Sequence, residues 1–243
     1  MSATQRSRRF WLVALAAAVG VALPLRLGVW QWSRAEHKIA WQAQIEQRET
    51  MPPVDERALA DPAVPPELLH RPVVLHGTWV KERTVYLDNR QMRGKPGFYV
   101  LTPLRLAGQN SAIVVERGWI PRNFEHRERL QPVETPPGLV EVRGRIAPPP
   151  PKLYDFGGAG IGAIRQNLDL GQFRAETGLA LLDMTVQQAG AASDGLLRDW
   201  PRADSGAATN YGYAFQWWAM SGLVAVLYVW FQIIAPRRKS SHA

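Results

Sequence analysis

The sequence predicts a membrane protein in which two transmembrane helices flank a beta-rich extracytoplasmic domain, folded as a small antiparallel barrel or sandwich. Three observations carry this prediction: a long apolar run near each end, basic residues beside those runs, and regularly spaced strand-like segments between them. The expected parts are a cytoplasmic tail at 1–9, a transmembrane helix at 10–32, the beta-rich domain at 33–209, a second transmembrane helix at 210–235 and a cytoplasmic tail at 236–243.

The C-terminal apolar run, YGYAFQWWAMSGLVAVLYVWFQIIA at residues 211–235, contains no charged residue. A membrane-spanning helix needs about 20 apolar residues, so this run is long enough to cross a bilayer. Tyrosine and tryptophan cluster toward both of its ends, where aromatic side chains favour the membrane interface. A buried helix of a soluble protein would rarely be so long and so free of charge, which favours the transmembrane interpretation.

The N-terminal run, FWLVALAAAVGVALPLRLGVWQW at residues 10–32, has two interpretations. A basic start followed by apolar residues with small alanines also describes a cleaved signal peptide. The stretch before Arg26 covers residues 10–25, slightly longer than the about 7–15 residues of a signal core, and apolar residues resume after it. A retained anchor is therefore expected, and residues 35–48 are expected to continue its helix out of the membrane.

The charge distribution predicts the orientation. All 21 acidic residues lie between Glu36 and Asp204, and the basic residues of that interval balance them. Basic residues favour the cytoplasmic side, so we expect both termini in the cytoplasm, the central domain in the periplasm and the chain in a bacterial inner membrane. Since the excess lies beside apolar runs and forms no basic patch, a nucleic-acid partner is not expected. The net charge of +8 comes from Arg6, Arg8, Arg9, Arg26, Arg34, Arg237, Arg238 and Lys239.

Five segments of the central region have strand character, because each is 8 to 10 residues long, rich in β-branched, leucine or aromatic residues, and bounded by turn-forming or charged residues. A further strand is expected at 180–187, after a short helix at 170–177. The five segments are RPVVLHGTWV, RTVYLDNR, GFYVLTPLRL, SAIVVERGWI and GLVEVRGRI, which begin at residues 71, 83, 97, 111 and 138.

Small residues recur at four-residue spacing in both apolar runs, at Ala14, Ala18 and Ala22 and at Ser221 and Ala225. Such stripes let the backbones of two membrane helices approach closely. Pairing of the two helices through these stripes is one hypothesis; chance spacing in an alanine-rich helix is the alternative.

No enzyme motif of the GxSxG, HExxH, GxGxxG or P-loop type occurs, and the absence of cysteine excludes disulfides, thiolate metal sites and cysteine nucleophiles. GGAGIG at 157–162 lacks a strand-to-helix context and predicts a flexible loop. His70 and His76 are six residues apart in a predicted strand and would face the same side, where a structural or exposed role is expected. No catalytic or metal-binding residue is assigned, and the chain is not expected to be an enzyme.

Several motifs together resemble the surfeit locus protein one family, the assembly factors of haem-copper cytochrome c oxidase. They occur in the family's order over nearly the whole chain, and jointly they are hard to obtain by chance. They are LGVWQWSR at 27–34 with Lys38 behind it, Arg71, Pro72, Val73 and Gly77, the segment 87–90, GFYVLTPL at 97–104, RGWIPR at 117–122 and GYAFQWWAM at 212–220.

The resemblance implies a membrane protein that promotes insertion of haem a into subunit I of cytochrome c oxidase, with haem A synthase as a second candidate partner. It also implies transient binding of haem a, for which the family's favoured ligand is a histidine just before the Gly-Tyr-Ala stretch. That position is Asn210 here, and asparagine is a poor axial ligand for haem iron. The alternative is a haem-free membrane scaffold or chaperone that stabilises an oxidase subunit intermediate by protein contacts.

The predicted topology brings aromatic and polar residues of both helices to the outer membrane boundary. We expect a cleft there for a flat amphiphile with carboxylates, in which arginines pair with propionates and indoles cover the macrocycle. An aromatic belt with a snorkelling arginine is the alternative. The candidate cofactor-binding residues are Arg26, Trp30, Gln31, Arg34, Tyr211, Tyr213 and Trp217, with Tyr211 or Tyr213 as substitute iron ligand.

The motif RGWIPR also has two interpretations. Arg117, Trp119 and Arg122 are candidate partner-binding residues, since tryptophan and arginine are typical interface anchors. Alternatively, Pro121 ends a strand there and the arginines hold the barrel through salt bridges to residues such as Asp88.

Overall fold

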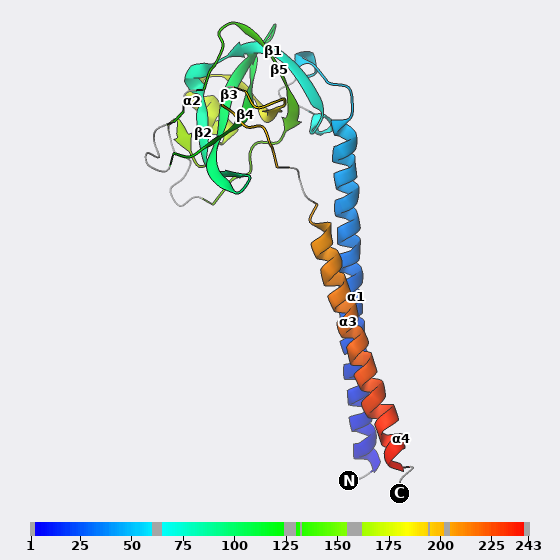
Figure 1. The fold of residues 1–243 in the computed structure, drawn as a ribbon. Helices are drawn as coiled ribbons and strands as arrows, with labels where there is room; N and C mark the ends of the chain where they lie inside the picture. The colour runs from blue at the N-terminus through cyan, green and yellow to red at the C-terminus, as the bar shows by residue number, and fades with distance from the viewer. Residues whose placement is uncertain are drawn as a thin grey trace. The chain divides into compact units, whose positions relative to one another are not determined.

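The computed structural model describes residues 3–59, 65–123, 130–131, 133–154, 162–193, 195–201 and 205–240. The chain forms two compact units (Figure 1). One unit combines Met1–Gln44 with Ala203–Ala243, and the other is Ile45–Arg202. The motif GGAGIG lies, except for Gly162, outside the described residues.

The unit Ile45–Arg202 is a β-barrel. Strands β1, β5, β7, β4 and β3 pair in that order, and β3 also pairs with β1, which closes the five strands on themselves. β2 and then β6 extend the sheet beyond β3, whose first half pairs with β2 and whose last residues pair with β1. The strands are β1 Pro72–Trp79, β2 Val85–Met92, β3 Lys95–Leu106, β4 Ser111–Pro121, β5 Leu139–Ala147, β6 Ile164–Arg165 and β7 Ala180–Gln188.

The predicted fold class is confirmed, and six strands match the predicted segments closely. One pairing in the barrel differs from a purely antiparallel order, because β7 runs parallel to β4. The helix α2, Leu170–Thr177, precedes β7, and parallel neighbours need such a crossover connection. The short strand β6 was not predicted, since two residues leave no periodicity to detect.

Helix α2 has clear sequence signals at both ends. The Asp169 side chain accepts a hydrogen bond from the Gln172 amide and caps the first turn. Gly178 ends the helix with φ 70°, a left-handed conformation that glycine adopts without a steric penalty. Between these caps Phe173 is buried and anchors the helix on the barrel core around Leu87 and Leu181.

His70 does not share a strand face with His76, so that prediction is wrong. His70 lies in a turn with φ 70°, two residues before β1 begins, whereas His76 lies within β1. The proline at position 72 starts the strand, which leaves His70 in the connection that reaches it.

The other unit is an antiparallel helix pair. Helix α1, Ala3–Glu49, includes the predicted continuation at 35–48. Helix α3, Ala207–Val229, is followed by a π-helical turn at Trp230–Ile234 and by α4, Ala235–Ser240. The N- and C-terminal ends lie at the same end of this pair (Figure 1), as the predicted topology requires.

The segments Phe10–Glu49 and Ala207–Arg237 are long and apolar enough to cross a membrane. Only 11% and 6% of their most apolar windows are buried within the molecule, unlike the core helix of a soluble protein. The apolar side chains of these helices therefore need an apolar surrounding, which a bilayer provides. The orientation and the limits of the spans stay predictions.

Candidate functional site

The contact face of α1 is a row of residues spaced three or four apart, namely Pro24, Gly28, Gln31, Ala35 and Lys38. Pro24, Gly28 and Ala35 are buried, and this spacing places them on one side of a helix. Ala18 and Ala22 of the predicted alanine stripe are exposed instead, so that stripe is not the contact face. The face is selected by the groups that α1 meets on α3, where Ala207, Asn210, Ala214 and Ser221 are buried.

Gly28 permits the closest approach in the pair. A Cβ atom at position 28 would lie 2.2 Å from Nε1 of Trp218, so the Trp218 indole occupies the space that a side chain would need. That indole stacks on Trp32, with ring centroids 5.7 Å apart. Trp32 also meets Tyr211 edge-on at 4.6 Å. These three rings pack together on one flank of the helix contact.

A polar ladder of Lys38, Asn210 and Gln31 crosses the helix contact beside Trp32 and Tyr211. The Nζ of Lys38 donates a hydrogen bond to Oδ1 of Asn210 at 2.7 Å, and Nδ2 of Asn210 donates to Oε1 of Gln31 at 2.7 Å. The Asn210 residue is only 8% exposed. Both ends of its amide are thus satisfied across the contact, as a buried polar group requires.

A second polar contact lies near the middle of the apolar run. Pro24 has no N–H group for the carbonyl of Gly20, four residues earlier, which weakens the helix at this point. The hydroxyl of Ser221 donates to the adjacent carbonyl, that of Val21, at 2.9 Å. This bond joins the two helices beside Pro24.

The structure does not gather the seven predicted cofactor-binding residues into one cleft. Arg26 is exposed and lies two residues before the buried Gly28, about 200° around the helix axis, so it is on the side of α1 away from α3. Trp30 is 51% exposed and carries the guanidinium of Arg34 over its ring at 5.5 Å. These two residues therefore contact each other on the outer surface of α1.

The remaining predicted residues divide between the interface and its edges. Gln31 belongs to the polar ladder, and Tyr211 packs against Trp32. Tyr213 is 50% exposed, and Trp217 is half-buried. Their binding of a cofactor stays a prediction.

The residues around position 210 do not fit axial ligation of haem iron. The groups that contact the Asn210 side chain are an ammonium and an amide, whereas haem iron in proteins takes imidazole, thioether, thiolate or phenolate ligands. The oxygen of Asn210 already accepts a charge-assisted hydrogen bond from Lys38. A haem at this position would have to displace the ladder.

In the barrel, the residues of RGWIPR are mostly buried. Arg117 is 2% exposed, and its guanidinium donates to Oγ1 of Thr135 and to the carbonyl of Glu134, both at 2.6 Å. The same guanidinium lies over the ring of Trp79 at 4.8 Å. Arg117 therefore ties β4 to the segment that leads into β5.

Trp119 and Arg122 also make contacts inside the domain. Trp119 is 2% exposed and donates from Nε1 to the carbonyl of Arg90 at 2.8 Å. Arg122 forms the predicted salt bridge to Asp88. These contacts support the structural interpretation of the motif, and burial of Arg117 and Trp119 weighs against the partner-binding interpretation, which stays a prediction.

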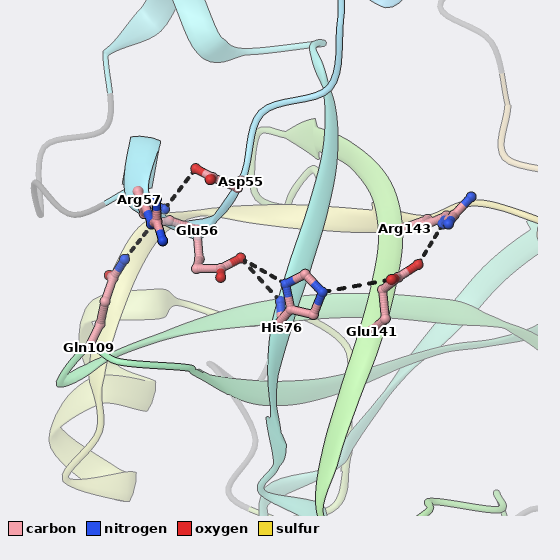
Figure 2. A network of polar contacts seen from close by, with 7 residues as sticks. All are labelled: Asp55, Glu56, Arg57, His76, Gln109, Glu141 and Arg143. Carbon is pink, nitrogen blue, oxygen red and sulfur yellow. Dashed lines mark hydrogen bonds and ion pairs between the residues drawn. The ribbon is translucent and has the colours of Figure 1, made fainter.

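His76 lies between two carboxylates on the barrel surface (Figure 2). Its Nδ1 is 3.4 Å from Oε2 of Glu56, and its Nε2 is 3.7 Å from Oε2 of Glu141. Burial opposes ionisation of Glu56, but hydrogen bonds from its own amide and from His76 outweigh it and lower the Glu56 pKa. The Arg143 guanidinium lowers the pKa of Glu141.

This network does not form a metal site. The two carboxylates contact different nitrogens of the ring, so a single ion could not take all three ligands. Across the part of the chain that the structure describes, no group of three or more His, Cys, Asp or Glu side chains could hold a metal ion. The network instead joins the 3₁₀ helix Glu56–Leu59 to β1 and β5.

Sequence reasoning did not assign a role to Lys38 or a structural role to Asn210. A signal for both was present, because each is a polar residue in phase with small residues: Lys38 follows Ala35 by three positions, and Asn210 precedes Ala214 by four. Polar side chains in such positions commonly bond across paired membrane helices.

Comparisons with known proteins agree with this architecture. The sequence model of the SURF1 family matches residues 18–222, which include parts of both helices and the whole barrel. A SURF1-like protein of Rickettsia felis is 26% identical over 118 residues, 48% of each chain. The human Surfeit locus protein 1 is 29% identical over 135 residues, 49% of this chain and 44% of that protein.

A yeast relative carries a functional name. The cytochrome oxidase assembly protein SHY1 of Saccharomyces cerevisiae is 27% identical over 94 residues, 39% of this chain and 24% of that protein. In these comparisons the chain spans less than half the length of each relative. The match to the family model nevertheless covers most of the chain, and on that ground the chain belongs to the SURF1 family.

Proposed function

We propose that this chain is a membrane-anchored assembly factor for haem-copper cytochrome c oxidase, which assists delivery of haem a to subunit I or its insertion there. The observation that carries the proposal is the match to the SURF1 family over 18–222, which extends from one apolar helix through the barrel into the other. The name of the yeast relative, a cytochrome oxidase assembly protein, agrees with it. The partners are subunit I and, as a second candidate, haem A synthase.

The proposed location is a bacterial inner membrane, with both termini in the cytoplasm and the barrel in the periplasm. The basic residues at both ends of the chain support this orientation. The chain has no cysteine, so single cysteines placed at Ser2 and at the exposed Leu139 can be labelled without background. Labelling of position 139 alone by an impermeant thiol reagent in spheroplasts supports the orientation, and labelling of position 2 contradicts it.

The chain is proposed to have no catalytic reaction of its own. Its contribution to haem a insertion would be to hold subunit I or the haem in position. Haem a would supply the iron and the macrocycle, while this chain would supply arginines for the propionates and indoles for the ring. Arg34 and Trp30 are the candidates on the accessible surface of α1.

A second candidate is a haem-free scaffold that stabilises an oxidase subunit intermediate through protein contacts. The specific observation is Asn210, whose amide bonds to Lys38 and Gln31 and is not available to iron. In this candidate, the helix pair contacts subunit I without binding its haem.

Two measurements test the proposal and separate its candidates. Deletion of the gene should reduce the a-type haem absorbance of the membranes, and the full chain supplied from a plasmid should restore it; a normal oxidase in the deletion strain would refute the assembly role. The full chain is then purified from cells that make haem A. A Soret band supports haem handling, and a colourless chain that still restores oxidase supports the scaffold.

A further inference from the structure

We propose that the polar ladder of Lys38, Asn210 and Gln31 acts as a lock, which fixes the rotation and register of α1 against α3. The lock concerns how the helix pair holds itself together, and so goes beyond the proposed role in oxidase assembly. In the fold it lies at the first turns of α3, where the chain from the barrel enters the apolar helix.

The contacts of Asn210 select one rotation of the helices. Its side chain is buried and uses its oxygen toward Lys38 and its nitrogen toward Gln31, each at 2.7 Å. Rotation of α3 by one residue, about 100°, would take the amide away from both partners. The paired rotation keeps both hydrogen bonds of the amide, one of them charge-assisted, and is therefore favoured over its neighbours.

The packing of Gly28 against the Trp218 indole favours this rotation, and the polar contacts add to that preference. Away from this contact face, apolar side chains such as Leu15, Val19 and Leu25 are exposed, and lipid solvates those sides of α1 about equally well. A single buried polar residue can set the register of paired helices when the apolar contacts leave alternatives. Lys38 adds a charge, which strengthens its hydrogen bond to Asn210.

The lock determines which side chains the helix pair presents to its surroundings. With Asn210 held between Lys38 and Gln31, the exposed pair Trp30 and Arg34 stays on the outer surface of α1. A partner subunit in the membrane would therefore always meet the same face. Lys38 and Gln31 are positioning residues in this proposal, since they act through the pairing of the helices.

Disulfide trapping in native membranes measures the rotation directly, because the full chain has no cysteine of its own. The register pair is Gly20→Cys with Val224→Cys, since a Cβ atom at position 20 would lie 3.3 Å from Cγ1 of Val224. The rotated pair is Gly20→Cys with Leu223→Cys, because Leu223 is 58% exposed and lies about 100° around α3 from Val224. Both pairs are distant in sequence from the lock.

Lys38→Met should raise the yield of the rotated pair relative to the register pair by about 3- to 18-fold, the range for loss of one interhelical hydrogen bond. Arg34→Met is the matched control, because it removes the same charge from an exposed position one turn earlier on α1. It should leave the ratio unchanged. An equal ratio in Lys38→Met and Arg34→Met would overturn the proposal.

Substitutions at position 210 provide an independent comparison. Asn210→Leu should raise the ratio as Lys38→Met does. Asn210→Asp should keep the ratio near the wild-type value, because a carboxylate can still accept a hydrogen bond from Lys38. In the double variant with Lys38→Met, the ratio should rise as it does in Lys38→Met alone. An Asp variant that behaves like the Leu variant contradicts the lock. Formation of the oxidase is scored separately, so failure of the assembly role would leave the disulfide ratio interpretable.

Discussion

Reversing the charge of Arg122 distinguishes a structural role of RGWIPR from a role in partner recognition. Arg122 extends over the ring of Phe98 on β3 to reach the carboxylate of Asp88 on β2. The Asp88 side chain is 7% exposed, and that of Arg122 is 23% exposed. Arg122→Glu would place a second carboxylate beside a buried one.

The expected cost follows from these exposures. Loss of one partner from a buried ion pair costs about 3–5 kcal/mol. The partial exposure of Arg122 lets the new side chain turn to water, and Asp88 keeps its hydrogen bond from the Asn89 amide, so we expect about 2–3 kcal/mol. At about 2–4 °C per kcal/mol for a domain of this size, the melting temperature should fall by about 4–12 °C.

The first assay is thermal melting of the purified full chain, monitored by circular dichroism. The second assay is co-purification of oxidase subunits with the same variants. Arg93→Glu is the matched control, since Arg93 pairs with Asp199 at side-chain exposures of 68% and 57%. Such an exposed pair contributes about 1 kcal/mol or less, so this variant should melt near the wild-type temperature. If Arg122→Glu melts like Arg93→Glu but no longer captures the oxidase subunits, the structural reasoning is refuted.

Two further predictions concern the barrel and the helix pair. Arg165→Met should lower the free energy of unfolding near neutral pH by about 2 kcal/mol, because the guanidinium donates to both oxygens of Glu176, at 2.8 and 2.5 Å. These bonds lower the pKa of Glu176, so the part of the wild-type advantage that depends on its charge should be complete above about pH 4.3 and decline as the pH falls through the lower folded value. Denaturant titrations that show a pH-independent difference would contradict this. Gly28→Ala should reduce disulfide formation in the register pair, because its Cβ would meet the Trp218 indole. Gly212→Ala, where a Cβ meets nothing within 4 Å, should not.

Local sequence patterns predicted most of the strands of the barrel. Segments such as 111–120 are rich in apolar residues and are bounded by turn-forming residues, which predicts strands. Asp169 and Gly178 mark the two ends of α2. Local patterns do not encode strand partners, so the parallel pairing of β7 with β4 and the closure through β3 and β1 appear only in the assembled sheet.

The sequence by itself also determined that two apolar helices exist, and how far along each helix its aromatic and basic residues lie, because a helix advances about 1.5 Å per residue. It predicted a shared boundary for Arg26, Gln31 and Tyr211 on that basis. Only the tertiary structure decided the rotation, in which Gln31 meets Asn210 while Arg26 turns away. Rotation depends on which of several apolar faces pairs, and that choice is made by contacts between residues far apart in the chain.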